Sequence, residues 1–112
     1  MSMITHASTS TTFDLPGHKT VATKGLVRGV VVRSRSVIGS FVGGLQTIFG
    51  GNITIYSELC EQAREEAFQL MLNHAYEMGG NAVVGVRYDA TDIMAGVTEV
   101  LAYGTAVVVE QV

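Results

Sequence analysis

The side chains best suited to binding soft metal ions are one cysteine, Cys60, and three histidines, His6, His18 and His74. Thiolate and imidazole are the ligands that such ions prefer, but no CxxC, HxxxH or HxH spacing occurs. Cys60 and His74 lie fourteen residues apart on one predicted helix, about 21 Å at 1.5 Å per residue. One ion therefore cannot use both within a subunit. They remain candidate metal ligands if side chains converge across subunits; the alternative is a buried structural Cys60 and a hydrogen-bonded core His74.

Two charged groups offer other kinds of site. Arg33 and Arg35 stand where a predicted strand leads into a helix, where guanidinium groups can hold an anion or a phosphate. The alternative is a polar strand end, or a salt bridge with glutamates of the second predicted helix. Asp89, Asp92 and Glu99 flank a predicted turn and offer oxygen ligands for a hard cation, although no EF-hand spacing supports one. The alternative here is a solvated charged turn.

The sequence shows no pattern typical of an enzyme. Ser40 and Ser57 have no histidine nearby in the sequence, so no nucleophile and base are paired by spacing. The glycine pairs at residues 43–44 and 50–51 lack the context of phosphate-binding loops. We therefore expect a non-enzymatic protein. An enzyme whose active site forms between subunits is the less favoured alternative.

The composition limits the function classes. The 112 residues are 47% hydrophobic and 15% charged, with a net charge of −3 and a mean hydropathy of +0.33. A disordered chain and a nucleic-acid binder are both disfavoured by these values. The single cysteine argues against a disulfide scaffold. The uncharged stretch over residues 36–57 is broken by glycines at 50–51, and no signal peptide is evident, so we expect a cytoplasmic protein without a membrane partner.

The helices and strands that must position these groups are predicted from the spacing of hydrophobic residues and from the glycines and the proline between them. Residues 1–18 form an N-terminal segment, with a short edge strand over residues 8–12 and a turn at Pro16 and Gly17. A long strand is predicted over residues 19–35. Hydrophobic residues then recur every three or four positions and predict a helix that ends at the glycines 50–51. That stripe comprises Val37, Ile38, Phe41, Val42, Leu45, Ile48 and Phe49.

A second, longer helix is predicted from Asn52 or Thr54 to about Met78, closed by glycines at 79–80. Its predicted apolar face comprises Tyr56, Cys60, Ala63, Ala67, Leu70, His74 and Met78. Two strands follow, over residues 82–89 and 97–110. A hairpin turn centred near Met94 would pair Asp89 with Glu99, Gly85 with Tyr103, and Val83 with Thr105.

The predicted order is ββααββ, an α+β fold with two helices on one face of a mostly antiparallel sheet. A domain of this size cannot hide both an uncharged first helix and valine-rich strands in one core. Exposed apolar surface of that kind marks an interface, so we expect an obligate homo-oligomer. The predicted interface residues on the first helix are Phe41, Leu45, Ile48 and Phe49.

Three motifs in order resemble the YbjQ-like family. They are Phe-Gly-Gly at residues 49–51 followed by Tyr56 and Ala-Arg-Glu-Glu-Ala at 63–67, then residues 80–89, and then residues 99–107. The resemblance covers about residues 20–110. We therefore predict a single domain of this family over residues 19–112. It implies a subunit similar to those of dodecins, assembled as a ring that is typically a pentamer. The family carries the description "putative heavy-metal-binding", which implies a divalent or heavy metal ion without a settled activity. Because Arg64 lies within a matching motif, an interface role is expected for it, beside a plain surface role.

The sequence thus predicts a homo-oligomeric ring that binds a metal ion or small ligand at its subunit junctions, with the chain itself as partner and no nucleic acid. The alternative is a structural or interaction ring with no bound ligand.

Overall fold

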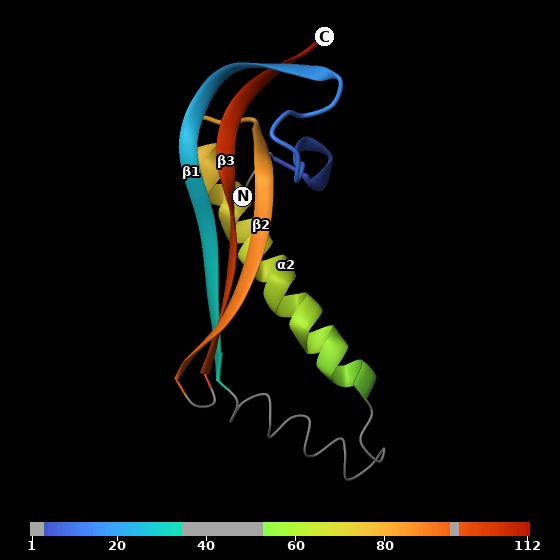
Figure 1. The fold of residues 1–112 in the computed structure, drawn as a ribbon, viewed down its shortest axis with the longest axis vertical. Coiled ribbons are helices and arrows are strands. Elements are labelled where there is room, and N and C mark those ends of the chain that lie inside the picture. The colour runs from blue at the N-terminus through green and yellow to red at the C-terminus, as the bar shows by residue number, and fades with distance from the viewer. Residues whose placement is uncertain (1–3, 35–52, 95–96) are drawn as a thin grey trace.

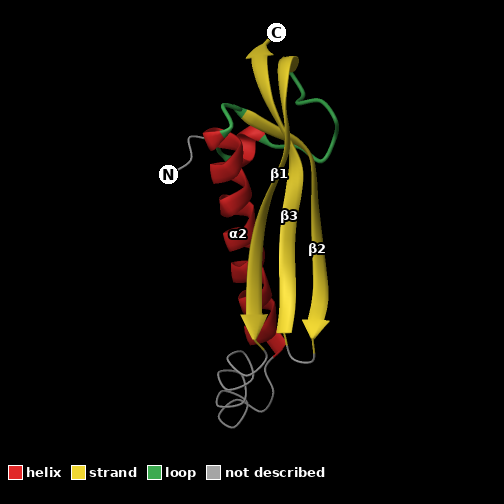
Figure 2. Ribbon diagram, turned by 90° about the vertical axis from the view of Figure 1, so that its left-hand side faces the viewer, coloured by secondary structure: helices red, strands yellow, loops and turns green. Residues whose placement is uncertain are grey.

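The computed structural model describes residues 4–34, 53–94 and 97–112. The order of elements is η1 (His6–Ser8), β1 (His18–Ser34), α2 (Ile53–Glu77), β2 (Ala82–Met94) and β3 (Val97–Gln111). The strands form one antiparallel sheet in the order β1-β3-β2, and α2 lies across one of its faces (Figures 1 and 2). The α+β class is confirmed, with three antiparallel strands and one helix. The predicted first helix, residues 37–49, lies outside the described residues.

The turn before β1 is the one that the sequence predicts. Proline fixes φ near −65°, and Gly17 has a φ of +76°, which glycine adopts without strain. The backbone N–H of His18 donates to the carbonyl of Leu15 at 3.1 Å and closes the turn. The chain then runs extended for the 17 residues of β1, close to the predicted strand over residues 19–35.

Helix α2 ends as predicted, at the glycine pair. Gly79 has a φ of +88°, its N–H donates to the carbonyl of Tyr76, and the N–H of Gly80 donates to that of Ala75. This pair of bonds is the Schellman motif, which satisfies carbonyls left unpaired at a helix end. No helix in the described ranges is long and apolar enough to span a membrane.

The predicted apolar face of α2 is only partly right. Ala63 and Ala67 are buried, whereas Cys60, Leu70 and Met78 are exposed and His74 is half-buried. The buried face is rotated toward the side covered by the N-terminal segment. It comprises Ala63, Ala67, Phe68, Met71, Leu72 and Ala75.

The predicted register of the β2–β3 hairpin is wrong. Asp89 lies opposite Leu101 rather than Glu99, and Val83 lies opposite Ala106 rather than Thr105. Irregularities between Val84 and Arg87, and between Asp92 and Met94, change the register along the pair. Arg87, and not Gly85, therefore faces Tyr103, and Gly85 lies within the first irregularity with a φ of +63°.

The main core lies between α2 and the sheet, and the closest approach is at Gly29 of β1. A Cβ atom there would lie 2.0 Å from the carbonyl oxygen of Ala67 and 2.6 Å from the backbone nitrogen of Met71. Only glycine allows the two backbones to come so near.

The N-terminal segment lies along β2. The predicted edge strand over residues 8–12 is reduced to a single parallel bridge between Thr9 and Val83. Its hydrogen bonds continue beyond the bridge: Ser10 N–H donates to Val83, Val86 N–H to Ser10, and Gly85 N–H to Thr12. Farther along, Leu15 packs on the sheet face opposite α2 in a second, smaller buried cluster with Ala82, Val84, Val107 and Val109.

Candidate functional site

The two soft-metal candidates do not meet within the subunit. Cys60 is exposed, contrary to the buried position that its helix face indicated. The Nδ1 atom of His74 accepts a hydrogen bond from the backbone N–H of Arg28, 3.3 Å away, so this imidazole carries its proton on Nε2. Both lie on the continuous helix α2, about 21 Å apart along its axis. Within the described ranges, no three His, Cys, Asp or Glu side chains gather closely enough to hold a metal ion.

Arg33, one of the two candidate anion-binding arginines, is paired within the subunit. Arg33 Nη2 donates to the Glu66 carboxylate on α2, and Arg33 Nη1 donates to its neighbour's carbonyl oxygen, that of Val32, at 3.4 Å. This is the helix-glutamate contact weighed in the sequence as the alternative to an anion site. Arg35 lies outside the described residues, as do the predicted interface residues Phe41, Leu45, Ile48 and Phe49. Arg64 is described and is exposed on α2.

The three carboxylates at the hairpin are split between the two faces of the sheet. Asp89 and Glu99 share the face opposite α2 but sit diagonally, because Asp89 pairs with Leu101 and Glu99 with Thr91. Asp92 lies on the other face, where it accepts a hydrogen bond from the Thr98 hydroxyl at 2.8 Å. The described geometry therefore does not assemble the hard-cation site.

A cluster that the sequence does not indicate joins the N-terminal segment to α2. The His6 ring stacks on Phe68, with centroids 4.2 Å apart, and Phe68 stacks in turn on Tyr88, with centroids 6.4 Å apart. His6 Nε2 lies 3.5 Å from the carboxylate of Glu65. Burial, followed by the nearby Glu65 carboxylate, raises the pKa of Tyr88 above its usual value. No spacing rule predicts this cluster, because His6 and Glu65 are 59 positions apart.

A second candidate surface is the sheet face that α2 does not cover. Val27, Gly29 and Val31 of β1 face the helix, so the alternating side chains of β1 point to the other side. We name this surface the open sheet face. Its residues are Leu26, Arg28, Val30 and Val32 of β1, Glu99, Leu101 and Tyr103 of β3, and Arg87, Asp89 and Thr91 of β2.

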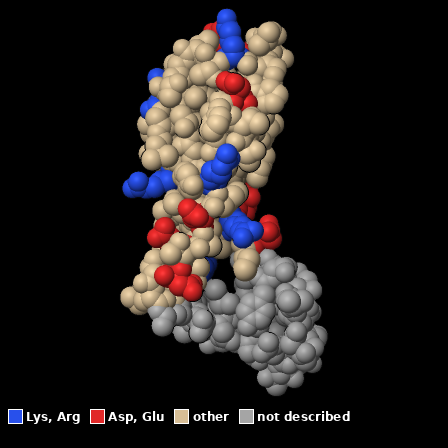
Figure 3. All heavy atoms as spheres, in the orientation of Figure 1, with Lys and Arg blue, Asp and Glu red and all other residues tan. Residues whose placement is uncertain are grey.

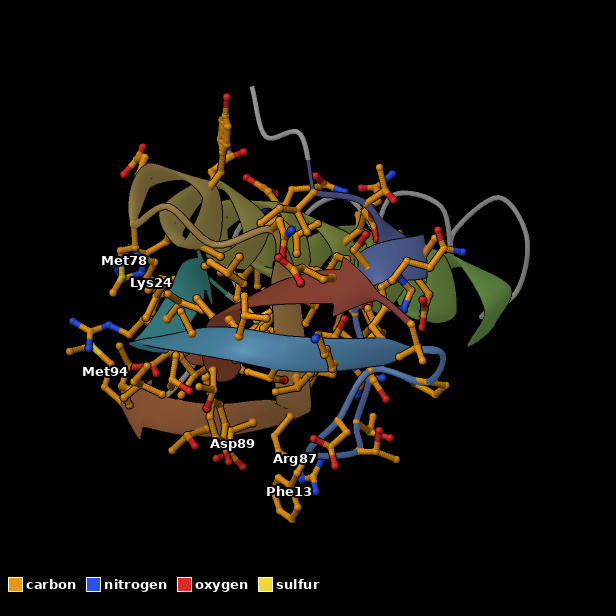
Figure 4. All side chains as sticks on the ribbon, turned by 90° about the horizontal axis from the view of Figure 1, so that it is seen from above. Phe13, Lys24, Met78, Arg87, Asp89 and Met94 are labelled. Carbon is orange, nitrogen blue, oxygen red and sulfur yellow. The ribbon has the colours of Figure 1, made fainter. Side chains whose placement is uncertain are left out.

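The open sheet face carries apolar side chains that are left exposed by the part of the chain that the structure describes. Leu26, Val30 and Val32 are 63%, 40% and 50% exposed. Figure 3 views the molecule from this side and shows broad uncharged areas between scattered charged groups. At its β2 margin, Arg87 Nη1 donates to the carbonyl of Thr11 at 2.9 Å, and Phe13 lies beside it (Figure 4).

The β1 margin of this face is a sheet edge at which no other strand of the described ranges pairs. β1 is an outer strand of the sheet, and the Arg28 N–H that bonds to His74 points away from β3. Backbone groups two residues away point the same way, so those of Leu26, Val30 and Val32 are directed outward as well. His74 bonds to the Arg28 N–H and the Arg33 side chain to the Val32 carbonyl, and the other outward backbone groups of this edge are donors and acceptors of the kind that pair with a further strand.

Comparisons with known proteins place the chain among relatives without an established activity. An uncharacterised "UPF0145 protein" of Paraburkholderia phymatum is 64% identical over 105 residues, which cover 94% of this chain and 95% of that protein. Another from Solibacter usitatus is 59% identical, with 94% of each chain covered.

The fold is also similar to a solved structure, a protein of unknown function of the DUF74 family from Pediococcus pentosaceus. The TM-score is 0.60 at 16% identity, with 91% of this chain and 96% of that chain covered. At that identity the likeness concerns the fold alone. The model of the YbjQ family, whose description is "Putative heavy-metal-binding", matches residues 7–110. With relatives this similar over nearly the whole chain, the protein belongs to the YbjQ family.

Proposed function

We propose that this chain is the subunit of a non-enzymatic, cytoplasmic homo-oligomeric ring, of five copies, that binds a metal ion or small ligand where subunits meet. The observation that carries the proposal is the apolar row of Leu26, Val30 and Val32 on the open sheet face. Large exposed apolar patches on a folded domain mark interaction surfaces. A long edge strand beside such a patch is a template for further pairing.

A junction is also where ligand groups from different copies can come together. Cys60 is exposed. His74 can bind a metal ion through Nε2 only if its proton moves to Nδ1, so binding would replace the hydrogen bond that Nδ1 accepts from Arg28. Thiolate and imidazole suit zinc and softer ions, in keeping with the description of the family. Because these two side chains are too far apart to share an ion within one subunit, the proposed site combines groups from neighbouring copies. The predicted helix over residues 37–49 is expected to add apolar surface to the junction.

The assembly is tested by placing a charge on the open sheet face. Leu26→Glu is expected to weaken association about a hundredfold or more, because assembly would bury an unpaired carboxylate. Light scattering coupled to size exclusion gives the assembled mass, and far-ultraviolet circular dichroism shows whether the subunit stays folded. Gln62→Glu adds the same charge on the exposed side of α2 and serves as the matched control. An unchanged assembled mass for a folded Leu26→Glu variant would contradict the proposed interface.

The ligand is tested by elemental analysis of the assembled protein after dialysis. The proposal predicts a fixed ratio of metal to chain that falls at least several-fold in Cys60→Ser or His74→Gln but not in His18→Gln. An assembled ring with no metal, and no change in these variants, would contradict the metal site and favour the ring without a bound ligand.

A further inference from the structure

An apolar side chain, that of Ile4, anchors the described part of the N-terminal segment on the main core. Ile4 is only 5% exposed and belongs to the same buried cluster as Phe68 of α2 and Val86 of β2. The turn of η1 follows, held by the Ser8 N–H that donates to Thr5 and by the Thr9 hydroxyl that donates to the carbonyl of His6. Residues 4–8 therefore lie across α2 and contribute to covering its apolar surface.

His6 is the ionisable group of this segment, and it meets an aromatic ring and a carboxylate at once. Its ring stacks on Phe68 at 4.2 Å with an interplanar angle of 19°. Its Nε2 atom is 3.5 Å from both oxygens of Glu65. A protonated imidazole is attracted by the carboxylate and by the face of the aromatic ring, whereas a neutral imidazole retains only the stacking and a weaker polar contact.

The other charged groups around the His6–Phe68 stack favour or oppose a positive charge on the imidazole. On α2, Glu61 lies one turn before Glu65 and favours a positive charge, while Arg64 opposes it. On β2, the Tyr88 phenol interacts with Glu65, Arg64 and Glu61. The pKa of Glu65 is lowered, first by the hydrogen bond that Gln69 donates; burial, the next effect in size, opposes this, and the two smaller contributions from His6 lower the pKa further. Glu65 thus stays ionised over the range in which a histidine changes charge, about pH 5 to 8.

We propose that residues 4–8 form a pH-sensitive clasp, which closes more tightly on α2 when His6 is protonated and opens more readily when it is neutral. Opening withdraws Ile4 from the cluster and uncovers Phe68 and Val86. The clasp acts within one subunit and does not depend on the ring or the metal proposed above.

Hydrogen exchange of the clasp measures its opening. The amides of Ser8, Thr9 and Ser10 are all hydrogen-bonded when it is closed. Exchange mass spectrometry of peptides spanning residues 4–12, corrected for the intrinsic exchange rate at each pH, gives the opening equilibrium. For an exposed ion pair we expect protection about two- to fivefold higher at pH 6 than at pH 8.

Three variants separate charge from packing. Glu65→Gln keeps an acceptor for Gln69 but removes the charge, and His6→Phe keeps a stacked ring without a proton. Both are expected to reduce the protection ratio between pH 6 and pH 8 to about one. Glu77→Gln, the same change near the other end of α2, should retain the ratio of the unaltered protein. The proposal is overturned if the unaltered protein shows equal protection at the two pH values, or if Glu65→Gln keeps its ratio.

Discussion

At the scale of single residues, the side chains suited to chemistry are largely engaged within the subunit. His74 bonds to the backbone of β1, and Arg33 pairs with Glu66. Each contact links α2 to β1 and contributes to the position of the helix on the sheet. Cys60 stands apart from them, exposed on α2. While the bond to Arg28 is kept, His74 offers a neighbouring molecule only an Nε2–H donor, whereas Cys60 presents an exposed thiol.

The lowered pKa of Glu65 predicts that the folded protein loses stability at acid pH. Its pKa is lowered below 4.5 in the folded protein, chiefly by the Gln69 amide and also by His6, so the unfolded chain binds its proton first as the pH falls. The stabilisation is full above about pH 4.5 and is lost as the pH falls through the folded-state pKa.

Because Glu65 is more than half exposed, its contribution should be under about 1 kcal/mol. Urea unfolding of the unaltered protein and of Glu65→Gln at a series of pH values between 3 and 7 measures it. The stability difference between the two proteins should shrink toward pH 3. A difference that grows on acidification would contradict this assignment.

The sequence predicted the distance between two side chains where both lie on one helix. It did not predict contacts between side chains that only the tertiary structure brings together. The separation of Cys60 from His74 follows from the helix rise alone, and α2 confirms that both lie on one helix. The contact of His6 with Phe68 depends on how the first residues return across α2. Nothing in the local sequence of either residue encodes that path.

At the scale of elements, the positions of the turn-forming and helix-ending glycines and of the proline helped to predict the bounds of β1 and α2 to within one or two residues. Pro16 with Gly17, and Gly79 with Gly80, adopt the conformations that their sequences favour. The hairpin register was not predictable in this way. The extra residues near Gly85 and Met94 shift the pairing, and alternation alone does not place such irregularities.

The contact of α2 with β1 predicts a sensitive position at Gly29. The Cβ of Gly29→Ala would overlap backbone atoms of Ala67 and Met71, so the helix must move away from the sheet. We expect a loss of about 1–3 kcal/mol or more in the free energy of unfolding. Urea unfolding at equal protein concentrations measures it, since assembly makes stability depend on concentration.

Gly80→Ala is the control for Gly29→Ala, because its new Cβ would meet its nearest neighbours at 3.2 Å and should cost less. Equal losses in the two variants, or a change at Gly29 within about 0.5 kcal/mol, would contradict the close packing of α2 on β1.

At the scale of the whole molecule, the two faces of the sheet differ. One packs against α2. The other carries exposed apolar side chains, and among the described residues the N-terminal segment covers it at the end where β2 begins and β3 finishes (Figure 2). A composition of 47% hydrophobic and 15% charged residues anticipates that surplus of apolar surface. It does not say which face is left uncovered. That follows from the placement of Gly29 against the helix, which directs Leu26, Val30 and Val32 to the other side.

The central claim is that the open sheet face is covered by further copies of this chain. Native mass spectrometry of the purified protein at low micromolar concentration tests it most directly, because it counts subunits and retains bound ions. We predict a single species at five times the 11.9 kDa mass of the chain, and an additional mass if a metal or ligand is retained. A species of 11.9 kDa alone would contradict the account, since the apolar row on β1 would then face water in the folded protein.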